Sequence, residues 1–384
     1  MLRVIRTLVR SPASTPPHSI PSSASFSLRR ATRLHSRVAP SIASHWSHSS
    51  RAAARNMSSS SLEISADARR LLDRVAHVVI PSLSAELHKG QAGKVALVGG
   101  SRMYTGAPFL ASMASLKAGG DLSHVFTIAG GGVANAIRAF SAELIVHPCL
   151  PDSEQEPWIS WSAERGIAHF ESQLARLSAL VVGPGLGRDD VTMACVQQLV
   201  AKARAAGMPV VLDGDALFMV SRDIAGTLAG VDEWVVLTPN VNEYKGLARA
   251  VAEADGAKFD ENKLPSVQDL SKRLGCTIIR KGQSDEIASG SKSLPVDISG
   301  SNRRCGGQGD VLAGTLGTFL SWAKAAAERG DCDESPVAIA CYGAAALTRL
   351  AAQRAFAQHK RAMTATSILD HIGDAFASVF PERV

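Results

Sequence analysis

The chain lacks paired cysteines and long apolar runs, and both absences narrow the kinds of protein it can be. Its six cysteines, at positions 149, 195, 276, 305, 332 and 341, are scattered, and no two of them form a Cys-x-x-Cys pair. This spacing argues against a zinc site and a disulfide framework, and it indicates a reducing compartment. No apolar run reaches the length of a transmembrane helix, so we expect no membrane span.

Two standard nucleotide-binding signatures are also missing. The sequence has no Gly-x-x-x-x-Gly-Lys-Ser/Thr motif, which excludes a Walker P-loop. Residues 183–188, Gly-Pro-Gly-Leu-Gly-Arg, resemble a dinucleotide fingerprint but lack its Gly-x-Gly-x-x-Gly spacing. A Rossmann domain is therefore a weak interpretation of this segment.

The first 56 residues contain no acidic residue and no lysine. They hold nine arginines, thirteen serines lie between positions 11 and 50, and the first acid of the chain is Glu63. This composition is typical of a mitochondrial or plastid transit peptide, although a disordered basic tail would share it. We assign residues 1–56 to such a leader and expect a mitochondrial protein, with Met57 as a second start that would give a cytoplasmic form.

The leader also accounts for the basic charge of the chain. The formal net charge is +6, with 41 basic and 35 acidic residues, and the leader holds nine of the basic residues. Residues 57–384 therefore carry −3 by subtraction, so the charge gives no sign of nucleic-acid binding. No arginine–aromatic platform points to nucleic acid either.

Short β-rich runs alternate with helical stretches from residue 94 onward. We expect strands at residues 95–98, 124–127, 143–146, 180–183, 210–213, 234–237 and 277–280, followed by short strands near 286–288 and 294–298. The expected helices include residues 107–118, 191–206, 241–252, 310–322, 337–355 and 365–377. Apolar strands that alternate with helices predict an α/β fold with a mostly parallel sheet covered on both faces.

Glycine-rich and polar segments follow five of the predicted strands. These segments are residues 98–101 (Val-Gly-Gly-Ser), 183–188, 213–215 (Asp-Gly-Asp), 238–243 (Thr-Pro-Asn-Val-Asn-Glu) and 281–285 (Lys-Gly-Gln-Ser-Asp). Ligands of parallel α/β sheets bind at the carboxyl ends of the strands. The five segments together therefore predict one ligand-binding edge.

A glycine-rich loop at residues 301–309 runs directly into an apolar helix, and Asp310 lies at the junction. Glycines let backbone N–H groups face a ligand, and a helix N-terminus favours an anion. A carboxylate there is placed to take a proton from a hydroxyl while a phosphate lies across the amides, which indicates phosphoryl transfer to an alcohol. The alternative is that Asp310 only caps the helix of residues 310–322.

Assembled, these motifs resemble the ATP/ADP-dependent NAD(P)H-hydrate dehydratases of the ribokinase-like superfamily. The resemblance covers residues 66–384 and also rests on residues 88–94 and 117–124. The Gly-Gln-Gly-Asp motif of residues 307–310 marks only the superfamily, whereas its combination with residues 183–187 and 238–243 is specific to the dehydratases. The resemblance implies one ribokinase-like domain, a three-layer α/β/α sandwich with a mostly parallel central sheet.

The resemblance also implies a repair reaction. Water adds to the nicotinamide ring of NADH or NADPH; a dehydratase phosphorylates the ring hydroxyl of the S-form with ATP, and phosphate then leaves. The implied substrates are NADH hydrate, NADPH hydrate and ATP, with Mg²⁺ as cofactor. A separate NAD(P)H-hydrate epimerase is the implied functional partner, and a homo-oligomer is allowed.

Roles carry over to individual residues. Asp310 would be the catalytic base, and Glu243 would hold Mg²⁺ through water. The hydrate would be bound by Gly187, Asn240, Val241, Asn242, Glu243, Tyr244, Lys245, Gly246 and Asp310. ATP would be bound by Lys281, Gly282, Gln283, Ser284, Asp285, Gly300, Ser301, Asn302, Arg303, Arg304, Cys305, Gly306, Gly307, Gln308 and Gly309.

Other interpretations of the same residues stay open. Asn240 and Glu243 also fit a capping box, and Asp213 and Asp215 fit structural caps. One rival function is a ribokinase-like kinase that releases a stable phosphorylated product. Another is a nicotinamide oxidoreductase or a non-catalytic nucleotide-binding protein. Measured turnover of ATP would exclude both of these.

The leader is predicted to be separable from the folded domain, because residues 1–56 have no acids and no apolar helical face for a core. A chain that begins at Met57 should fold. A reporter protein fused to residues 1–56 should enter mitochondria of a non-photosynthetic host, which fluorescence microscopy can measure. A reporter that stays in the cytosol would contradict the targeting prediction alone.

Overall fold

The computed structural model describes residues 64–86, 88–156, 160–332 and 335–381. The chain divides by its contacts into two units, Met1–Leu62 and Glu63–Val384, and all described residues lie in the second. The predicted leader, residues 1–56, lies outside the described residues and stays a prediction. No helix of the described part is long and apolar enough to cross a membrane.

One sheet of nine strands runs through the second unit, in the order β3-β2-β1-β4-β5-β6-β7-β8-β9. The strands are β1 Lys94–Val98, β2 Leu122–Ile128, β3 Leu144–Leu150, β4 Ala179–Val182, β5 Val210–Leu212, β6 Val235–Leu237, β7 Thr277–Arg280, β8 Asp285–Ser289 and β9 Lys292–Val296. The first seven strands pair in parallel, and β8 and β9 continue the sheet antiparallel. The prediction of a mostly parallel sheet is confirmed.

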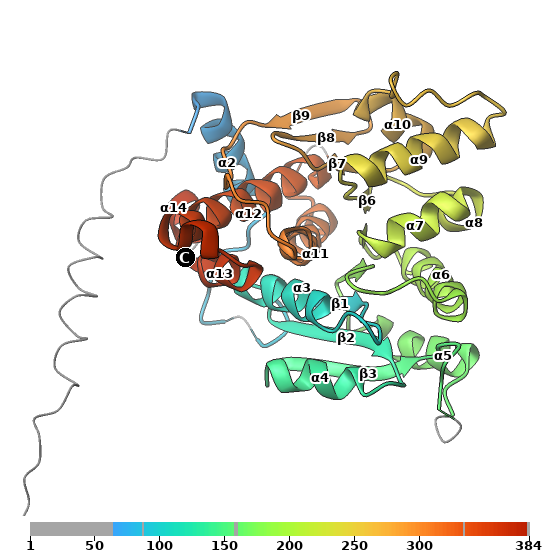
Figure 1. Ribbon diagram of the computed structural model, residues 1–384. Helices are drawn as coiled ribbons and strands as arrows, with labels where there is room; N and C mark the ends of the chain where they lie inside the picture. Colours follow the sequence, from blue (N-terminus) through green and yellow to red (C-terminus); the bar gives the residue numbers. More distant parts are fainter. Residues whose placement is uncertain (1–63, 87, 157–159, 333–334, 382–384) are drawn as a thin grey trace, which may run out of the picture. The chain divides into compact units, whose positions relative to one another are not determined.

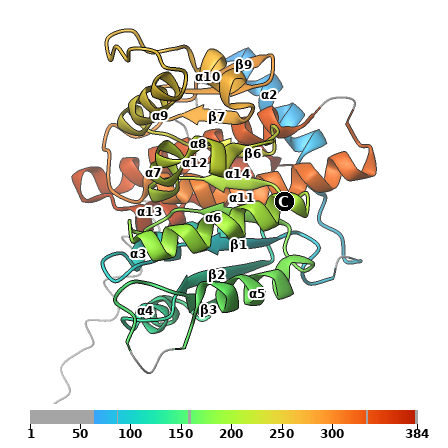
Figure 2. The same cartoon turned by 90° about the vertical axis from the view of Figure 1, so that its right-hand side faces the viewer.

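Helices cover both faces of this sheet and make it the middle of three layers (Figures 1 and 2). One layer holds α2 Ala66–Val78, α3 Gly106–Lys117, α4 Val133–Phe140, α11 Gln308–Arg329, α12 Val337–His359, α13 Ala365–Asp370 and α14 Ile372–Val379, with the 3₁₀ turn η2 Lys360–Ala362. The other layer holds α5 Ala163–Leu174, α6 Asp190–Ala205, α7 Asp215–Arg222, α8 Ile224–Leu228, α9 Val241–Ala254 and α10 Val267–Leu274.

Two predicted helices differ from the observed ones. The stretch expected as one helix at 365–377 is two helices, α13 and α14, separated at His371. The helix expected at 310–322 begins earlier, at Gln308, with Gly307 as its N-cap in the left-handed region. Asp310 is therefore the third residue of helix α11, and the interpretation of Asp310 as the residue that caps this helix is wrong.

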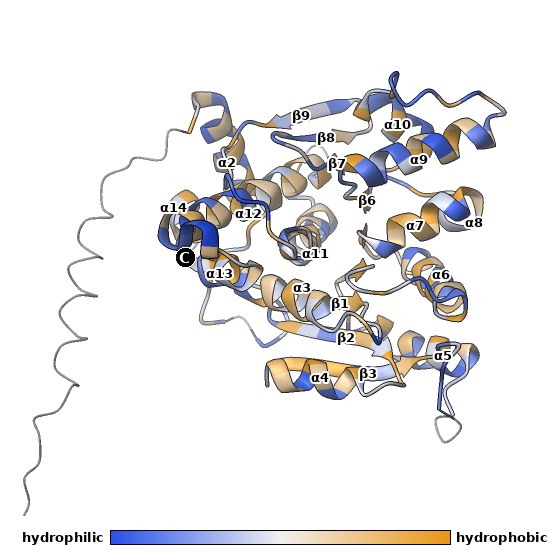
Figure 3. Ribbon diagram, in the orientation of Figure 1, coloured by the Kyte–Doolittle hydropathy of each residue, from blue (hydrophilic) through white to orange (hydrophobic). Residues whose placement is uncertain are grey.

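The central strands are buried on both faces, as their composition requires. Every residue of β4, β5 and β6 is buried, and these strands consist of Ala, Val and Leu alone. Figure 3 shows the contrast with the connection between α9 and α10, which is largely hydrophilic. Strands without polar side chains leave the chemistry to the loops at their ends.

Helix α11 is buried along most of its length, because glycines let it lie very close to its neighbours. A Cβ atom on Gly314 would lie 1.8 Å from the carbonyl oxygen of Ala111 in α3. A Cβ atom on Gly317 would lie 2.7 Å from Val181 of β4 and 2.9 Å from Val95 of β1. The threonine hydroxyl of Thr318 donates a hydrogen bond of 2.9 Å to the carbonyl oxygen of Ser115. These contacts fix the position of α11, and with it the position of Asp310.

Replacing Gly314 with alanine should destabilise the fold, because the new methyl group meets the backbone of α3. We expect a loss of about 1–3 kcal/mol, the usual cost of overpacking, and a melting temperature lower by several degrees. The matched control is Gly373→Ala in α14, where a Cβ atom meets nothing within 4 Å. Thermal unfolding should show the control unchanged or slightly stabilised; equal melting temperatures for both variants would contradict the packing argument.

Candidate active site

A cavity of about 860 Å³ opens at the carboxyl ends of β5, β6 and β7 and at the N-terminus of α11. Its wall contains most of the residues that the resemblance assigns to ATP and several that it assigns to the hydrate. These are Asn240, Val241, Asn242, Glu243, Lys281, Gly282, Gln283, Asp285, Gly300, Ser301, Asn302, Arg304, Cys305, Gly307, Gln308, Gly309 and Asp310. Three of the five segments predicted to form one ligand-binding edge contribute to this wall: residues 213–215, 238–243 and 281–285. Residues from the other two, 98–101 and 183–188, line a neighbouring cavity.

Lys281 is one of three cations that line this cavity, with Arg304 and Arg349. It follows β7, and its ammonium donates a hydrogen bond of 2.6 Å to Asp213 Oδ1 at the end of β5. The same Asp213 oxygen accepts a hydrogen bond of 2.7 Å from the hydroxyl of Thr238, and Glu243 lies 3.9 Å from the ammonium. Burial opposes the charged form, but the surrounding carboxylates outweigh burial and raise the pKa of Lys281.

Asp310 lies on the first turn of α11 beside this group. A Cβ atom on the preceding Gly309 would lie 3.2 Å from the ammonium of Lys281, so a side chain there would crowd the lysine. Burial is the main cause that raises the pKa of Asp310 to about 7, and repulsion from Asp213 adds to it, while Lys281 acts in the opposite direction. A carboxyl group with a pKa near 7 can both accept and return a proton close to neutral pH.

Asn240 and Glu243 form the capping box that the sequence allows. The side chain of Asn240 accepts hydrogen bonds from the N–H groups of Asn242 and Glu243, at 2.9 and 3.0 Å. The carboxylate of Glu243 accepts one of 2.7 Å from the N–H of Asn240. Burial raises the pKa of Glu243, although Lys281 and this N–H group act against the rise. Because both residues also line the cavity, the capping role does not exclude a ligand role.

Asp213 and Asp215 are more than structural caps. Asp213 is buried and pairs with Lys281. Asp215 is the first residue of α7, after Gly214 as N-cap, and its side chain accepts a hydrogen bond of 2.9 Å from the N–H of Gly187. The Asp213–Asp215 turn therefore connects the cavity to the segment that follows β4.

Arg349 of helix α12 is a wall residue that sequence reasoning missed. Its guanidinium lies 2.9 Å from Asp285, donates to the carbonyl oxygen of Ile298 at 2.6 Å, and also donates to the carbonyl oxygen of Gln283. Asp285 in turn accepts a hydrogen bond of 2.9 Å from the N–H of Gly282. Arg349 thus holds the turn at 281–285 in place, and the one signal for it was a cation inside an alanine-rich helix.

Several predicted site residues lie off the wall of this cavity. Tyr244 is buried and donates its hydroxyl to the carbonyl oxygen of Pro265, and Ser284 donates to the carbonyl oxygen of Val296. Arg303 donates to the carbonyl oxygen of Met363. Lys245, Gly246 and Gly306 are also absent from the wall, and Gly187 lines a second, neighbouring cavity. Their assignment to ligands stays a prediction.

Comparison with known proteins decides the family. A family model described as NAD(P)H-hydrate dehydratase matches residues 95–373. The chain belongs to the NAD(P)H-hydrate dehydratase family. It is 42% identical over 322 residues to the ATP-dependent (S)-NAD(P)H-hydrate dehydratase of Physcomitrium patens, covering 77% of this chain and 92% of that protein. It is 40% identical over 303 residues to the human protein of the same name, covering 79% and 82%.

Solved structures agree on the fold of this family. A ribokinase-like superfamily protein from Enterococcus faecalis aligns with a TM-score of 0.62 at 21% identity, over 81% of this chain and 94% of that chain. The ADP/ATP-dependent NAD(P)H-hydrate dehydratase from Bacillus subtilis, co-crystallised with ATP/Mg²⁺, aligns with a TM-score of 0.54 at 20% identity, over 80% and 97%. The prediction of a ribokinase-like sandwich is confirmed.

The raised pKa of Asp310 predicts a specific dependence of stability on pH. In the unfolded chain the carboxyl loses its proton near pH 4, whereas in the folded protein it keeps the proton until about pH 7. Its full contribution to stability is thus present below pH 4 and is lost as the pH rises through 7; the difference is at most roughly 4 kcal/mol before solvent screening. Asp310→Asn should therefore raise the melting temperature at pH 8 by a few degrees and much less at pH 4.

Asp223 provides the opposite control for this measurement. A hydrogen bond from Gln197 is the main cause that lowers its pKa, so Asp223 stabilises the fold above pH 4. Asp223→Asn should lower the melting temperature at pH 8. If the Asp310→Asn protein melts below the parent at pH 8, the ionised carboxylate of Asp310 does not destabilise the folded protein, and the prediction is wrong.

Proposed function

We propose that the protein removes water from the S-form of hydrated NADH and NADPH at the expense of ATP, which makes it a carbon–oxygen lyase of metabolite repair. The family supports the activity. One wall of the cavity would hold ATP, and the half-buried Asp310 beside it would be the base.

The first half of the reaction is phosphoryl transfer. Asp310 takes the proton from the ring hydroxyl, the hydroxyl oxygen forms a bond to the γ-phosphorus of ATP, and the bond to the β,γ-bridging oxygen breaks to release ADP. Backbone N–H groups of Gly306, Gly307 and Gly309 at the start of α11, with Lys281 nearby, would stabilise the charge on the transferred group.

The second half is elimination. The lone pair of the ring nitrogen forms a double bond to the carbon that carries the phosphate, and the C–O bond electrons leave with phosphate. Loss of a proton from the neighbouring ring carbon then restores the dihydronicotinamide. Phosphate is a far better leaving group than hydroxide. Phosphorylation by ATP therefore gives the ring carbon the good leaving group that spontaneous dehydration lacks.

The single observation that carries this proposal is the environment of Asp310. A base for a hydroxyl must lie beside the anion site and must be able to ionise near neutral pH. Asp310 meets both conditions, because it is on the first turn of α11 at the cavity wall and its pKa is about 7. A residue that only capped the helix would need neither.

Mg²⁺ is part of the proposal, and the residues present fit an indirectly held ion. Across the described ranges, no three His, Cys, Asp or Glu side chains are grouped to hold a metal ion. Glu243 offers one carboxylate at the cavity, which suits a cation held mainly by phosphate oxygens and water. When bound, the ion would neutralise charge on the phosphates, and Glu243 would orient its water.

Two wider assignments accompany the activity. A separate NAD(P)H-hydrate epimerase would convert the R-form into the S-form that this protein consumes. Residues 1–56 would direct the protein to mitochondria, with a cytoplasmic form from Met57.

The purified protein should restore dihydronicotinamide absorbance from NADH hydrate only with a nucleoside phosphate and Mg²⁺. Asp310→Asn is the matched negative control: it should still bind ATP and lose at least roughly 10²-fold in kcat, the usual contribution of a positioned base. The parent kcat/KM should fall below pH about 7, where Asp310 is protonated. A folded protein that yields only a stable phosphorylated hydrate would be a kinase and not a dehydratase. Near-normal turnover by Asp310→Asn would show that Asp310 is not the catalytic base.

Glu243→Gln separates the metal role from the capping role. Glutamine can still accept the hydrogen bond from the N–H of Asn240, so the free energy of unfolding should stay within about 1 kcal/mol of that of the parent. A neutral amide is a poorer partner for a hydrated cation, so the Mg²⁺ concentration for half-maximal rate should rise at least roughly tenfold. The control is Glu253→Gln at the exposed end of α9. If Glu243→Gln and the control need the same Mg²⁺ concentration for half-maximal rate, Glu243 does not hold the metal ion.

A further inference from the structure

A second cavity of about 390 Å³ lies on the same edge of the sheet, over the ends of β1 to β4. Ser101 and Tyr104 from the loop after β1, Ile128 from β2 and Leu186 from the loop after β4 line it. Tyr104 is 52% exposed, so its ring is open to a flat ligand. The hydroxyl of Ser101 is buried and makes no hydrogen bond to the described residues. The size suits one nucleoside.

The two cavities meet at the Asp213–Asp215 turn. Asp213 and Gly214 line the first cavity, and Asp215 lines the second. Gly187, which the resemblance assigns to the hydrate, belongs to the second cavity. ATP would occupy the β7 and α11 side of the first cavity, so the rest of a dinucleotide whose reacting ring lies at Asp310 extends toward the second.

The rim of the second cavity is acidic. Four carboxylates line it, those of Asp152, Glu154, Asp189 and Asp215, against the two guanidinium groups of Arg102 and Arg188. Arg188 pairs with Asp215 at 3.3 Å. The local charge is therefore negative.

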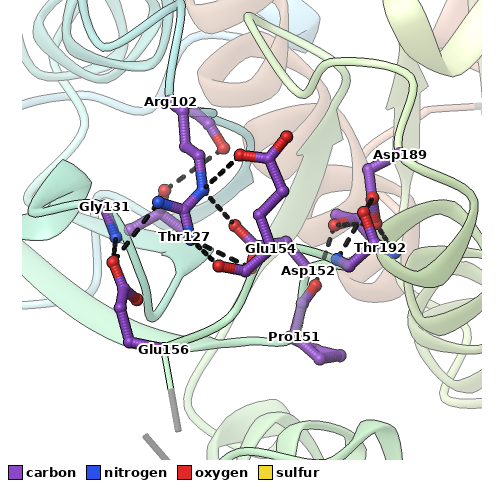
Figure 4. A network of polar contacts seen from close by, with 11 residues as sticks. Arg102, Thr127, Gly131, Pro151, Asp152, Glu154, Glu156, Asp189 and Thr192 are labelled. Atoms are coloured by element: carbon purple, nitrogen blue, oxygen red, sulfur yellow. Dashed lines mark hydrogen bonds and ion pairs between the residues drawn. The ribbon is translucent and has the colours of Figure 1, made fainter.

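Arg102 is not free to bind an anion (Figure 4). Its Nε lies 3.0 Å from Asp152 and 3.6 Å from Glu154, and its Nη1 lies 3.3 Å from Glu156. A further hydrogen bond of 2.6 Å goes to the carbonyl oxygen of Glu154. Three carboxylates thus hold one guanidinium, and the side chain of Glu154 stays 77% exposed.

We propose that this second cavity binds the adenosine half of the hydrated dinucleotide and selects NADH hydrate over NADPH hydrate. The inference rests on the proposed function and adds its substrate preference. Carboxylates accept hydrogen bonds from the 2′- and 3′-hydroxyls of a free ribose, whereas a 2′-phosphate needs an arginine that is not already paired. The adenine ring packs on Tyr104 and the apolar wall.

Binding of substrate fragments tests the cavity without turnover. The full chain is saturated with a non-hydrolysable ATP analogue and Mg²⁺, which fills the first cavity, and is titrated by calorimetry with ADP-ribose and with 2′-phospho-ADP-ribose. ADP-ribose should bind at least about fivefold more tightly, since the extra phosphate meets like charge. Equal affinities, or no binding of either, would overturn the proposal.

Two variants assign the effect to residues. Glu154→Lys should shrink the preference at least about fivefold by adding a cation at the rim, and Glu143→Lys, the same change just before the amino end of β3, should leave it as in the parent. Tyr104→Ala should weaken both ligands by roughly the same factor, fivefold or more, because it removes base stacking. A preference that Glu154→Lys leaves unchanged, or affinities that Tyr104→Ala leaves unchanged, would contradict the assignment.

Kinetics with the two hydrates separates this inference from the proposed function. If absorbance recovers with both hydrates at equal kcat/KM values, the proposed dehydratase activity stands and the proposed preference for NADH hydrate is wrong. Suppose instead that neither hydrate gives recovery but the preference for ADP-ribose still depends on Glu154. The proposed ligand site in the second cavity would then stand, and the proposed dehydratase activity would be wrong. The expected result is recovery with both and a kcat/KM at least about fivefold higher for NADH hydrate.

Discussion

Helix α11 can reach its position only because nothing larger than hydrogen stands at Gly314 and Gly317. The backbone of α3 and the side chains of β1 and β4 occupy the space that side chains would need. This close packing buries most of the helix and leaves its N-terminus at the carboxyl edge of the sheet. The Gly307–Asp310 turn, the ammonium of Lys281 and the cavity wall from α12 all depend on that placement. The fold therefore fixes the position of the base through packing one and two turns further along the same helix.

The protonation of Asp310 follows from its burial, from Lys281 and from the acids nearest to it. Lys281 contacts Asp213 directly and Glu243 at a longer distance, so it cannot neutralise Asp310 as well. Burial and the charge on Asp213 then raise the pKa of Asp310 to about 7, while Lys281 keeps it from rising further. This arrangement costs stability at neutral pH and gives a base whose proton can be gained and lost during a reaction.

How far the sequence predicts this site depends on the range of the contacts involved. Local features can be predicted from the types of neighbouring residues. They include the strand ends, the capping box of Asn240 and Glu243, and the glycine loop before Asp310. The role of Arg349 is different, because it joins α12 to Asp285 over sixty-four positions, and no local pattern marks that pairing. The break at His371 and the start of α11 at Gln308 depend on tertiary packing and on a left-handed Gly307, which propensity alone does not reveal.

The order of the strands explains why two cavities share one edge. From β1 the chain moves to β2 and β3 on one side and to β4 through β7 on the other, so the loops after β1 and β4 diverge there, as at other topological switch points. The Asp213–Asp215 turn stands next to this divergence. Asp213 faces Lys281 on one side, and Asp215 holds the N–H of Gly187 and the guanidinium of Arg188 on the other. Asp213 and Asp215 also both raise the pKa of Asp310. The turn that supports both cavities therefore contributes to the raised pKa of the base.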